Sequence, residues 1–133
     1  MATARQTVAA AIKASTGFTV SDYPQEPAQL RGAKPFVDVF ATDIIPVEGD
    51  TQLEHRLEVH VYASRTAGPD AEDEVEDNRD AVLLALQRIP GLSWDRAERV
   101  MFMGGTAIGY KITATAVSEN EYRKQILSEG TTP

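Results

Sequence analysis

Acidic residues between positions 70 and 80 form the densest group of side chains that could do chemistry. They are Asp70, Glu72, Asp73, Glu74, Glu76, Asp77 and Asp80. On a helix, Asp73 would face Asp77 and Glu76 would face Asp80, and such carboxylate pairs can hold Mg²⁺. A calcium loop is excluded because its bracing glycine is missing. Acidic side chains also gather at the positive end of a helix without a ligand, and we favour this interpretation over a metal-dependent hydrolase.

The two histidines give no catalytic or metal-binding arrangement. His55 and His60 lie in one expected strand at an odd spacing, so they point to opposite faces and cannot bind one metal from that strand. We interpret His55 as a residue at the edge of the core and His60 as a surface residue. The sequence contains no cysteine, no G-x-S-x-G motif and no G-x-x-x-x-G-K phosphate loop. It therefore predicts no enzyme, no cofactor and no metal site.

Composition predicts one soluble, cytosolic domain. The chain has 133 residues, which is about one domain. Lys and Arg number 13 against 20 Asp and Glu, and the formal net charge of −7 disfavours binding to nucleic-acid phosphates. No segment is apolar and long enough for a signal peptide or a bilayer span. We expect a single domain over residues 1–117 and a C-terminal extension over 118–133 that is flexible or docks on a partner.

Residue spacing predicts that helices alternate with pairs of strands. Apolar side chains recur at every second position over 53–64 and at helical spacing over 70–89. Gly104-Gly105 predicts a hairpin turn. The expected elements are helix 3–15 with Thr3 as N-cap and Gly17 past its end, strands 18–20, 35–42 and 53–64, helix 70–89, and strands 99–103 and 108–117. This order predicts an α+β fold: one mostly antiparallel sheet of about four or five strands with two helices packed on one face.

The expected strands leave two features without a partner. The second face of strand 53–64 would be wet or covered by another chain, and it carries Glu54, Arg56, Glu58, His60 and Tyr62. The segment before this strand is unusually apolar for a connection, and contains Ile44, Ile45 and Val47. These residues either extend a strand against the core or form an arm that inserts into a neighbouring subunit. We expect Trp94 to cover the end of the core, with an interface anchor as the alternative.

Several segments of the sequence, taken together, are similar to those of one protein family. They are TGFTV after the first helix, KPFVDVF, HRLEVHVYAS, EDEVEDNRDAVLLALQRI and WDRAERVMFMGGTAIGYKITATAV. In this order they resemble the tail terminator family of long-tailed bacteriophages, the minor tail protein U-like proteins. The resemblance covers about residues 4–117. It lies in the order of the expected helices and strands, and it includes no motif as specific as a catalytic signature.

The resemblance implies a structural role in the virion tail, with assembly in the host cytoplasm. Such proteins form a hexameric ring on the last ring of the tail tube, stop its polymerisation and present a surface for joining the head. The implied partners are further copies of the chain, the tail tube protein and the head–tail joining protein, and DNA passes through without specific binding. The alternatives are another phage neck or head–tail joining protein, or a small oligomeric assembly protein.

A ring requires one patch of each subunit to contact a different patch of the next. We predict one patch at Ile44, Ile45 and Val47 and part of the other at Arg56, Glu58 and Tyr62. In the extension, the apolar set Tyr122, Ile126 and Leu127 is expected to dock on a partner as a short helix.

Overall fold

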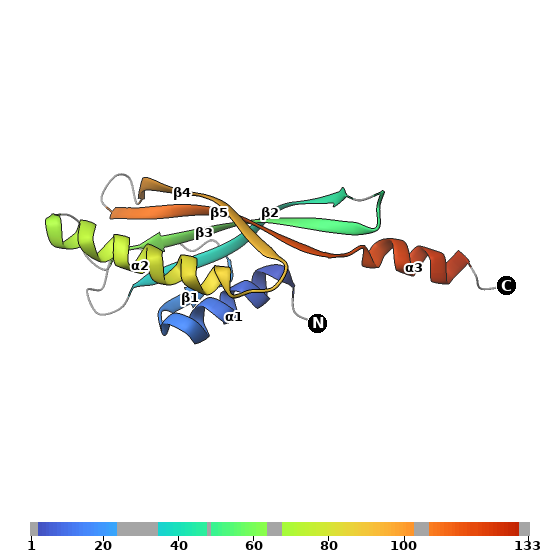
Figure 1. The fold of residues 1–133 in the computed structure, drawn as a ribbon, viewed down its shortest axis with the longest axis horizontal. Helices are drawn as coiled ribbons and strands as arrows, with labels where there is room; N and C mark the ends of the chain where they lie inside the picture. The colour runs from blue at the N-terminus through green and yellow to red at the C-terminus, as the bar shows by residue number, and fades with distance from the viewer. Residues whose placement is uncertain (1–2, 24–34, 48, 64–67, 103–106, 131–133) are drawn as a thin grey trace.

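A computed structural model describes residues 3–23, 35–47, 49–63, 68–102 and 107–130 (Figure 1). The elements are α1 (Ala4–Thr16), β1 (Thr19–Ser21), β2 (Phe36–Val47), β3 (Gln52–Tyr62), α2 (Pro69–Gln87), β4 (Leu92–Phe102), β5 (Ala107–Glu119) and α3 (Glu121–Gly130). The five strands form one sheet, and α1 and α2 pack together on one of its faces. The predicted α+β fold is confirmed. The Gly104-Gly105 turn lies outside the described residues.

The sheet has the order β1-β2-β3-β5-β4. The short strand β1 is parallel to β2, and the other three pairings are antiparallel. The edge strand β4 begins at Leu92, well before the expected residue 99. Its first half carries mostly exposed polar side chains, so no apolar alternation marks it, and pairing with β5 is what holds it in the sheet.

The hydrophobic core lies between the sheet and the two packed helices. Buried side chains of β2, β3 and β5 meet buried side chains of α1 and α2; they are Val37, Val39, Leu57, Val59, Val61 and Ile112 against Val8, Ile12, Val82, Ala85 and Leu86. The period-two spacing of β3 and the helical spacing of α2 both place these residues inward, as expected from the sequence. The core fixes the helices on one end of the sheet face.

Helix α1 begins and ends where the sequence predicts. The Thr3 hydroxyl accepts a hydrogen bond from the Gln6 backbone N–H (3.2 Å), and the Gln6 side chain accepts one from the Thr3 N–H (3.0 Å). This capping box satisfies two backbone donors that the helix itself leaves unpaired. Gly17 ends the helix with a φ of 71°, a conformation that glycine adopts without strain.

Replacing Thr3 with alanine is expected to lower the free energy of unfolding by about 1 kcal/mol, because one capping hydrogen bond is lost. Chemical denaturation measures the difference. The exposed Thr7 of the same helix provides the control, since Thr7→Ala removes a hydroxyl without removing a cap. Equal stabilities of the two variants would show that the cap contributes nothing.

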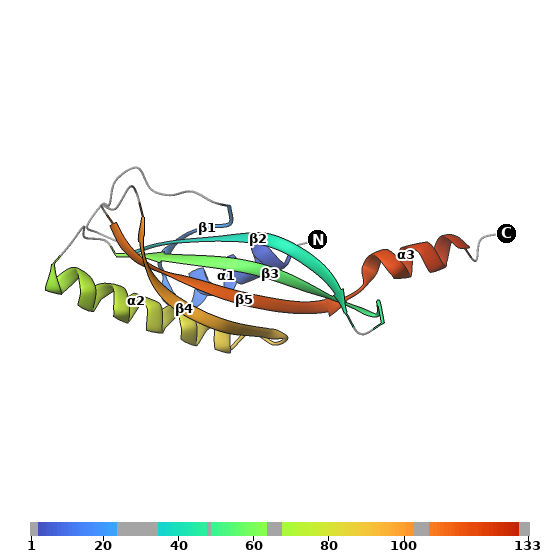
Figure 2. The ribbon, with the colours of Figure 1, turned by 90° about the horizontal axis from the view of Figure 1, so that it is seen from above.

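Strands β2 and β3 continue past the helices as a long hairpin (Figures 1 and 2). Their pairing runs from Phe36 opposite Tyr62 to Val47 opposite Gln52, with a register shift between Ala41 and Asp43. We call residues 43–47 and 49–54 the arm. The apolar segment that the sequence placed between two strands therefore extends β2.

Helix α3 follows β5 and points away from the domain body along the direction of the arm (Figures 1 and 2). Its start is tied to the turn of the arm. Asn120 donates its backbone N–H to the Thr51 carbonyl (3.1 Å) and its side-chain N–H to the Asp50 carbonyl (2.9 Å). Arg123 donates to the Gly49 carbonyl (2.7 Å) and, from its backbone, to the Asn120 side chain (3.0 Å). The predicted boundary at residue 117 thus lies inside β5, which runs to Glu119.

Candidate assembly surface

Exposed apolar side chains gather where the arm, the end of β5 and α3 meet. Ile44 is 47% exposed, and on α3 the values are 57% for Tyr122, 64% for Ile126 and 59% for Leu127. Large apolar side chains exposed to this degree in one region mark contact sites with other molecules more often than isolated ones do. This region is therefore the strongest candidate site in the described part of the chain.

Two open grooves run through this region. The first, which we call the body groove, has a volume of about 520 Å³ and lies between the start of α1, the turn at 89–91 and the end of the sheet. Ala41, Ile44 and Leu57 line its sheet side. These side chains share the face that α1 and α2 cover further along, so the body groove is the uncovered end of that face.

The second groove, which we call the arm groove, lies between the arm and α3. It also has a volume of about 520 Å³. Pro46 and Leu53 line it from the arm, and Ile126 lines it from the helix. Ile44 and Tyr122 line both grooves, so the two form one continuous apolar surface. We call this surface the trough.

The three residues predicted for the first patch lie on opposite faces of the arm. Ile44 is paired with His55, and both line the body groove. Ile45 and Val47 alternate with it along the strand, so their side chains are on the second face, where both are half-buried. Ile44 joins the α3 residues in the trough, whereas Ile45 and Val47 are separated from them by the sheet.

The three residues predicted for the other patch are in different environments. Arg56 is exposed and lies 3.9 Å from the Asp43 carboxylate. Glu58 forms an ion pair with Lys111 (3.2 Å). Tyr62, by contrast, is 1% exposed, so the expectation that it lies on a wet face is wrong. Aromatic side chains from other strands cover it.

An aromatic cluster covers the second face of the sheet at the end opposite the arm. It contains Phe36, Phe40, His60, Tyr62 and Phe102. The ring centres of Tyr62 and Phe102 are 4.5 Å apart, and those of His60 and Phe102 are 5.0 Å apart. These distances are typical of favourable tilted ring contacts. The prediction that His60 is a surface residue is therefore wrong, while the half-buried His55, hydrogen-bonded to the Ser118 hydroxyl at 2.8 Å, matches its prediction.

A buried carboxylate lies beneath these rings. Asp38 is 1% exposed, accepts a hydrogen bond from the Tyr62 hydroxyl (3.2 Å) and lies 3.3 Å from Nδ1 of His60. The other ring nitrogen of His60 is 3.9 Å from the Glu58 carboxylate. A buried carboxylate needs such partners because losing water is costly for a charged group. The cluster thus connects β2 and β3 by polar contacts within an apolar shell.

Replacing Tyr62 with phenylalanine is expected to lower the free energy of unfolding by about 1.5–3 kcal/mol, because a hydrogen bond to a buried charged acceptor is lost. Thermal and chemical denaturation measure the change. Tyr122→Phe is the matched control, since that side chain is 57% exposed and its hydroxyl can bond to water. A loss of stability as small as that of the control would contradict a structural role for the Asp38 contact.

The acidic residues of α2 do not converge on a metal site. No group of three or more histidine or acidic side chains in the described ranges is arranged to hold a metal ion. Glu72 forms an ion pair with Arg99 of β4, and its hydrogen bond from that guanidinium lowers the pKa of Glu72. Glu74 accepts a hydrogen bond from Asn78 (3.4 Å). Asp73, Glu76, Asp77 and Asp80 are exposed.

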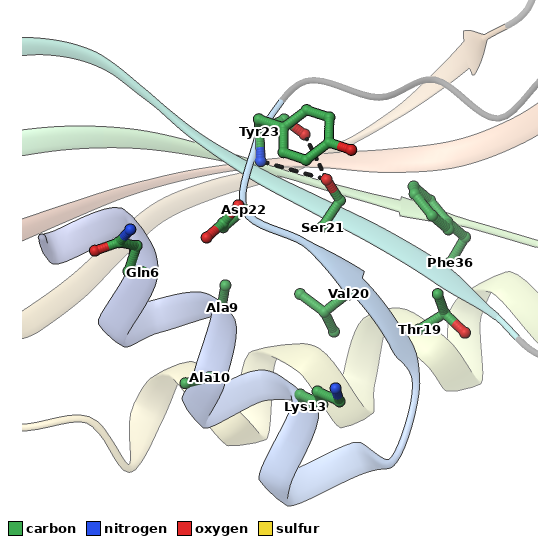
Figure 3. Close-up of a pocket in the computed structure, with 10 residues that line it drawn as sticks. All are labelled: Gln6, Ala9, Ala10, Lys13, Thr19, Val20, Ser21, Asp22, Tyr23 and Phe36. Atoms are coloured by element: carbon green, nitrogen blue, oxygen red, sulfur yellow. Dashed lines mark hydrogen bonds between the residues drawn. The ribbon is translucent and has the colours of Figure 1, made fainter. Parts of the chain in front are cut away.

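A third hollow, of about 390 Å³, lies between α1 and β1 (Figure 3). Lys13 and Gln6 line it from the helix, and Ser21 and Tyr23 line it from the strand side. The Ser21 hydroxyl donates to the Tyr23 carbonyl (3.0 Å) and accepts from the Tyr23 N–H (3.4 Å), so its hydrogen bonds are local. This arrangement does not point to a bound ligand.

Trp94 of β4 contacts the last residue of α2. Trp94 is 37% exposed on β4 and donates from its indole nitrogen to the Gln87 side chain (3.3 Å). In the ranges described, no helix combines the length and apolar character needed to cross a membrane.

No protein-family model matches the chain, and no curated protein is significantly similar to it.

Sequence reasoning missed two contributors to these surfaces. Asp38 stands as a single charge inside an apolar strand segment, and that isolation was the available signal for a buried partner. Asn120 belongs to the extension expected to be flexible or to dock on a partner, although an asparagine directly before a helical segment is a typical N-cap.

Proposed function

We propose that this protein is a tail terminator: a structural subunit that forms a ring on the end of a phage tail tube, stops the tube from growing and presents a surface for joining the head. The observation that carries the proposal is the trough. It is an exposed apolar surface built on two elements, the arm and α3, that extend beyond the folded body. Elements that leave the body and expose apolar side chains are suited to contacts with other protein chains.

The shape of the subunit supports assembly by unlike patches. The trough lies on the helix-covered face of the sheet, and the exposed acidic surface of α2 lies at the other end of the molecule. A contact that joins one patch to a different patch of the next copy generates a ring when the rotation closes.

The charge of the chain supports a channel through which DNA can move. A ring of six copies would carry six times the formal charge of −7. A field of this sign repels phosphates and keeps the channel from retaining DNA. The exposed carboxylates of α2 contribute much of this charge; they are Asp70, Asp73, Glu76, Asp77 and Asp80.

Binding to tube ends provides a direct experiment. Purified tail tubes from the same phage are incubated with the protein carrying a gold-labelled tag, and electron microscopy locates the label. Terminator function predicts label at one end of the tubes and not along their walls. Label distributed along the walls, or absent from the ends, would contradict the proposal.

A further inference from the structure

The orientation of α3 is fixed by the arm. Three hydrogen bonds of Asn120 and Arg123 hold the first turn of the helix against the turn at 49–51, and a fourth, from the Arg123 backbone to the Asn120 side chain, caps the helix itself. From that attachment the helix runs away from α1, α2 and the core (Figures 1 and 2). Glu121 and Tyr122 at the start of α3 border the body groove of their own chain, but α3 would have to reverse its direction and break these bonds to bring Ile126 and Leu127 over it.

The apolar stripe of α3 faces the arm groove, so its own chain covers the stripe only in part. Tyr122 and Ile126 are one helical turn apart and Leu127 widens the stripe, so the three share one side of the helix. Each is more than half exposed. An isolated helix of 10 residues is marginal in water, so packing of its apolar side against another surface would stabilise it.

The charge of α3 suits contact with another copy of the same acidic chain. Glu121 and Glu129 are balanced by Arg123 and Lys124, so the helix carries no formal net charge while the whole chain carries −7. A second copy can accept this helix without the repulsion that the acidic surface of α2 would cause. The rim of the body groove is also nearly balanced, since Arg5 and Glu121 both line it.

The body groove has the size and chemistry to receive an amphipathic helix. Its volume of about 520 Å³ lies in the range of protein binding sites, roughly 300–1,000 Å³. Its floor is formed by apolar side chains of the sheet, including Ala41 and Ala116, whose small size leaves room for larger side chains. A helix in an apolar groove is a common mode of recognition between proteins.

From these observations we propose that α3 of one copy docks in the body groove of a second copy. The contact joins two different surfaces of the chain, as a ring requires. This contact depends on the proposed function in one respect only: a terminator ring is one assembly that the contact would build. Ile126 and Leu127 supply the apolar contacts from the helix, and Ala41, Ile44 and Ala116 supply them from the groove.

Disulfide trapping tests this contact, and the absence of natural cysteines makes it free of background. Full-length chains carrying Ile126→Cys are mixed with full-length chains that carry Ala41→Cys and a different affinity tag. The mixture is oxidised at a protein concentration of about 1 mM, at which even a contact with a millimolar dissociation constant is well populated. The control replaces Ala41→Cys by Leu84→Cys, because Leu84 is 53% exposed on α2, outside both grooves. A double variant with both cysteines in one chain reports whether α3 reaches its own groove.

We expect the Ile126→Cys and Ala41→Cys pair to form the mixed disulfide about tenfold faster than the control pair, because docking raises the local thiol concentration. Equal rates would overturn the proposal. A double variant that closes mainly within one chain would overturn it as well, by showing α3 on its own body. This experiment needs no tail tube, so it is independent of the tube-labelling experiment. If the disulfide forms but the protein does not label tube ends, only the terminator role is contradicted. If the protein labels tube ends but the disulfide does not form, only the α3 contact is contradicted.

Discussion

Replacing Gly109 with alanine is expected to lower the free energy of unfolding by about 3 kcal/mol or more, the upper range for overpacking a protein interior. Gly109 is buried on β5, on the face that carries the aromatic cluster. A Cβ at this position would overlap the backbone carbonyl oxygen of Val61 and lie 2.6 Å from Cε2 of Phe102. The Val61 oxygen belongs to the central strand β3 and cannot move without disturbing the sheet.

Two variants make the Gly109 prediction specific. Thr113→Ala changes another residue on the same face of β5, where a smaller side chain creates no overlap, and should cost much less. Adding Phe102→Leu to Gly109→Ala should restore only part of the stability, because the overlap with the Val61 carbonyl remains. Chemical denaturation of the three variants measures these differences. A Gly109→Ala protein within about 1 kcal/mol of the natural sequence would contradict the packing described here.

Replacing Ile44 and Ile45 together with aspartate is expected to abolish assembly and leave a folded chain. Ile44 lies in the trough and is 47% exposed, so a carboxylate there is tolerated by the single subunit. In an assembled contact the same carboxylate would be buried without a partner, at a cost of about 3 kcal/mol or more, which is about a hundredfold in affinity. Circular dichroism checks folding, and light scattering on the assembled protein measures the oligomer.

The single variants separate the two faces of the arm. Ile44→Asp changes the trough, whereas Ile45→Asp changes the second face. We expect the first to account for the loss of assembly. Leu84→Asp places the same charge on an exposed apolar position of α2 outside the trough and should leave assembly unchanged. An oligomer of unchanged mass in the double variant would show that the arm is not a contact.

The fold class could be predicted from the sequence because its signals are local. Strict alternation over 53–64 located β3, and Thr3 and Gly17 located both ends of α1. Edge strand β4 was placed too short, because exposed polar residues such as Asp95 and Arg96 carry no alternating pattern. Its position follows from pairing with β5, which is a long-range interaction.

The candidate surface could be predicted only in part, because side-chain direction depends on features remote in sequence. The register shift after Ala41 changes which residues share a face, and it places Ala41 and Ile44 on one side of β2. Tyr62 was expected to be exposed to solvent, because the alternating pattern identifies the two faces of a strand but not what covers the second face. Its cover comes from Phe36 and Phe102, which belong to other strands.

Measuring tail length tests the proposed terminator function most directly. Phage particles are assembled with the natural protein and without it, and tube lengths are measured by electron microscopy. A terminator predicts one sharp length when the protein is present, and long tubes of irregular length with few attached heads when it is absent. Tubes of the same uniform length in both preparations would contradict the account.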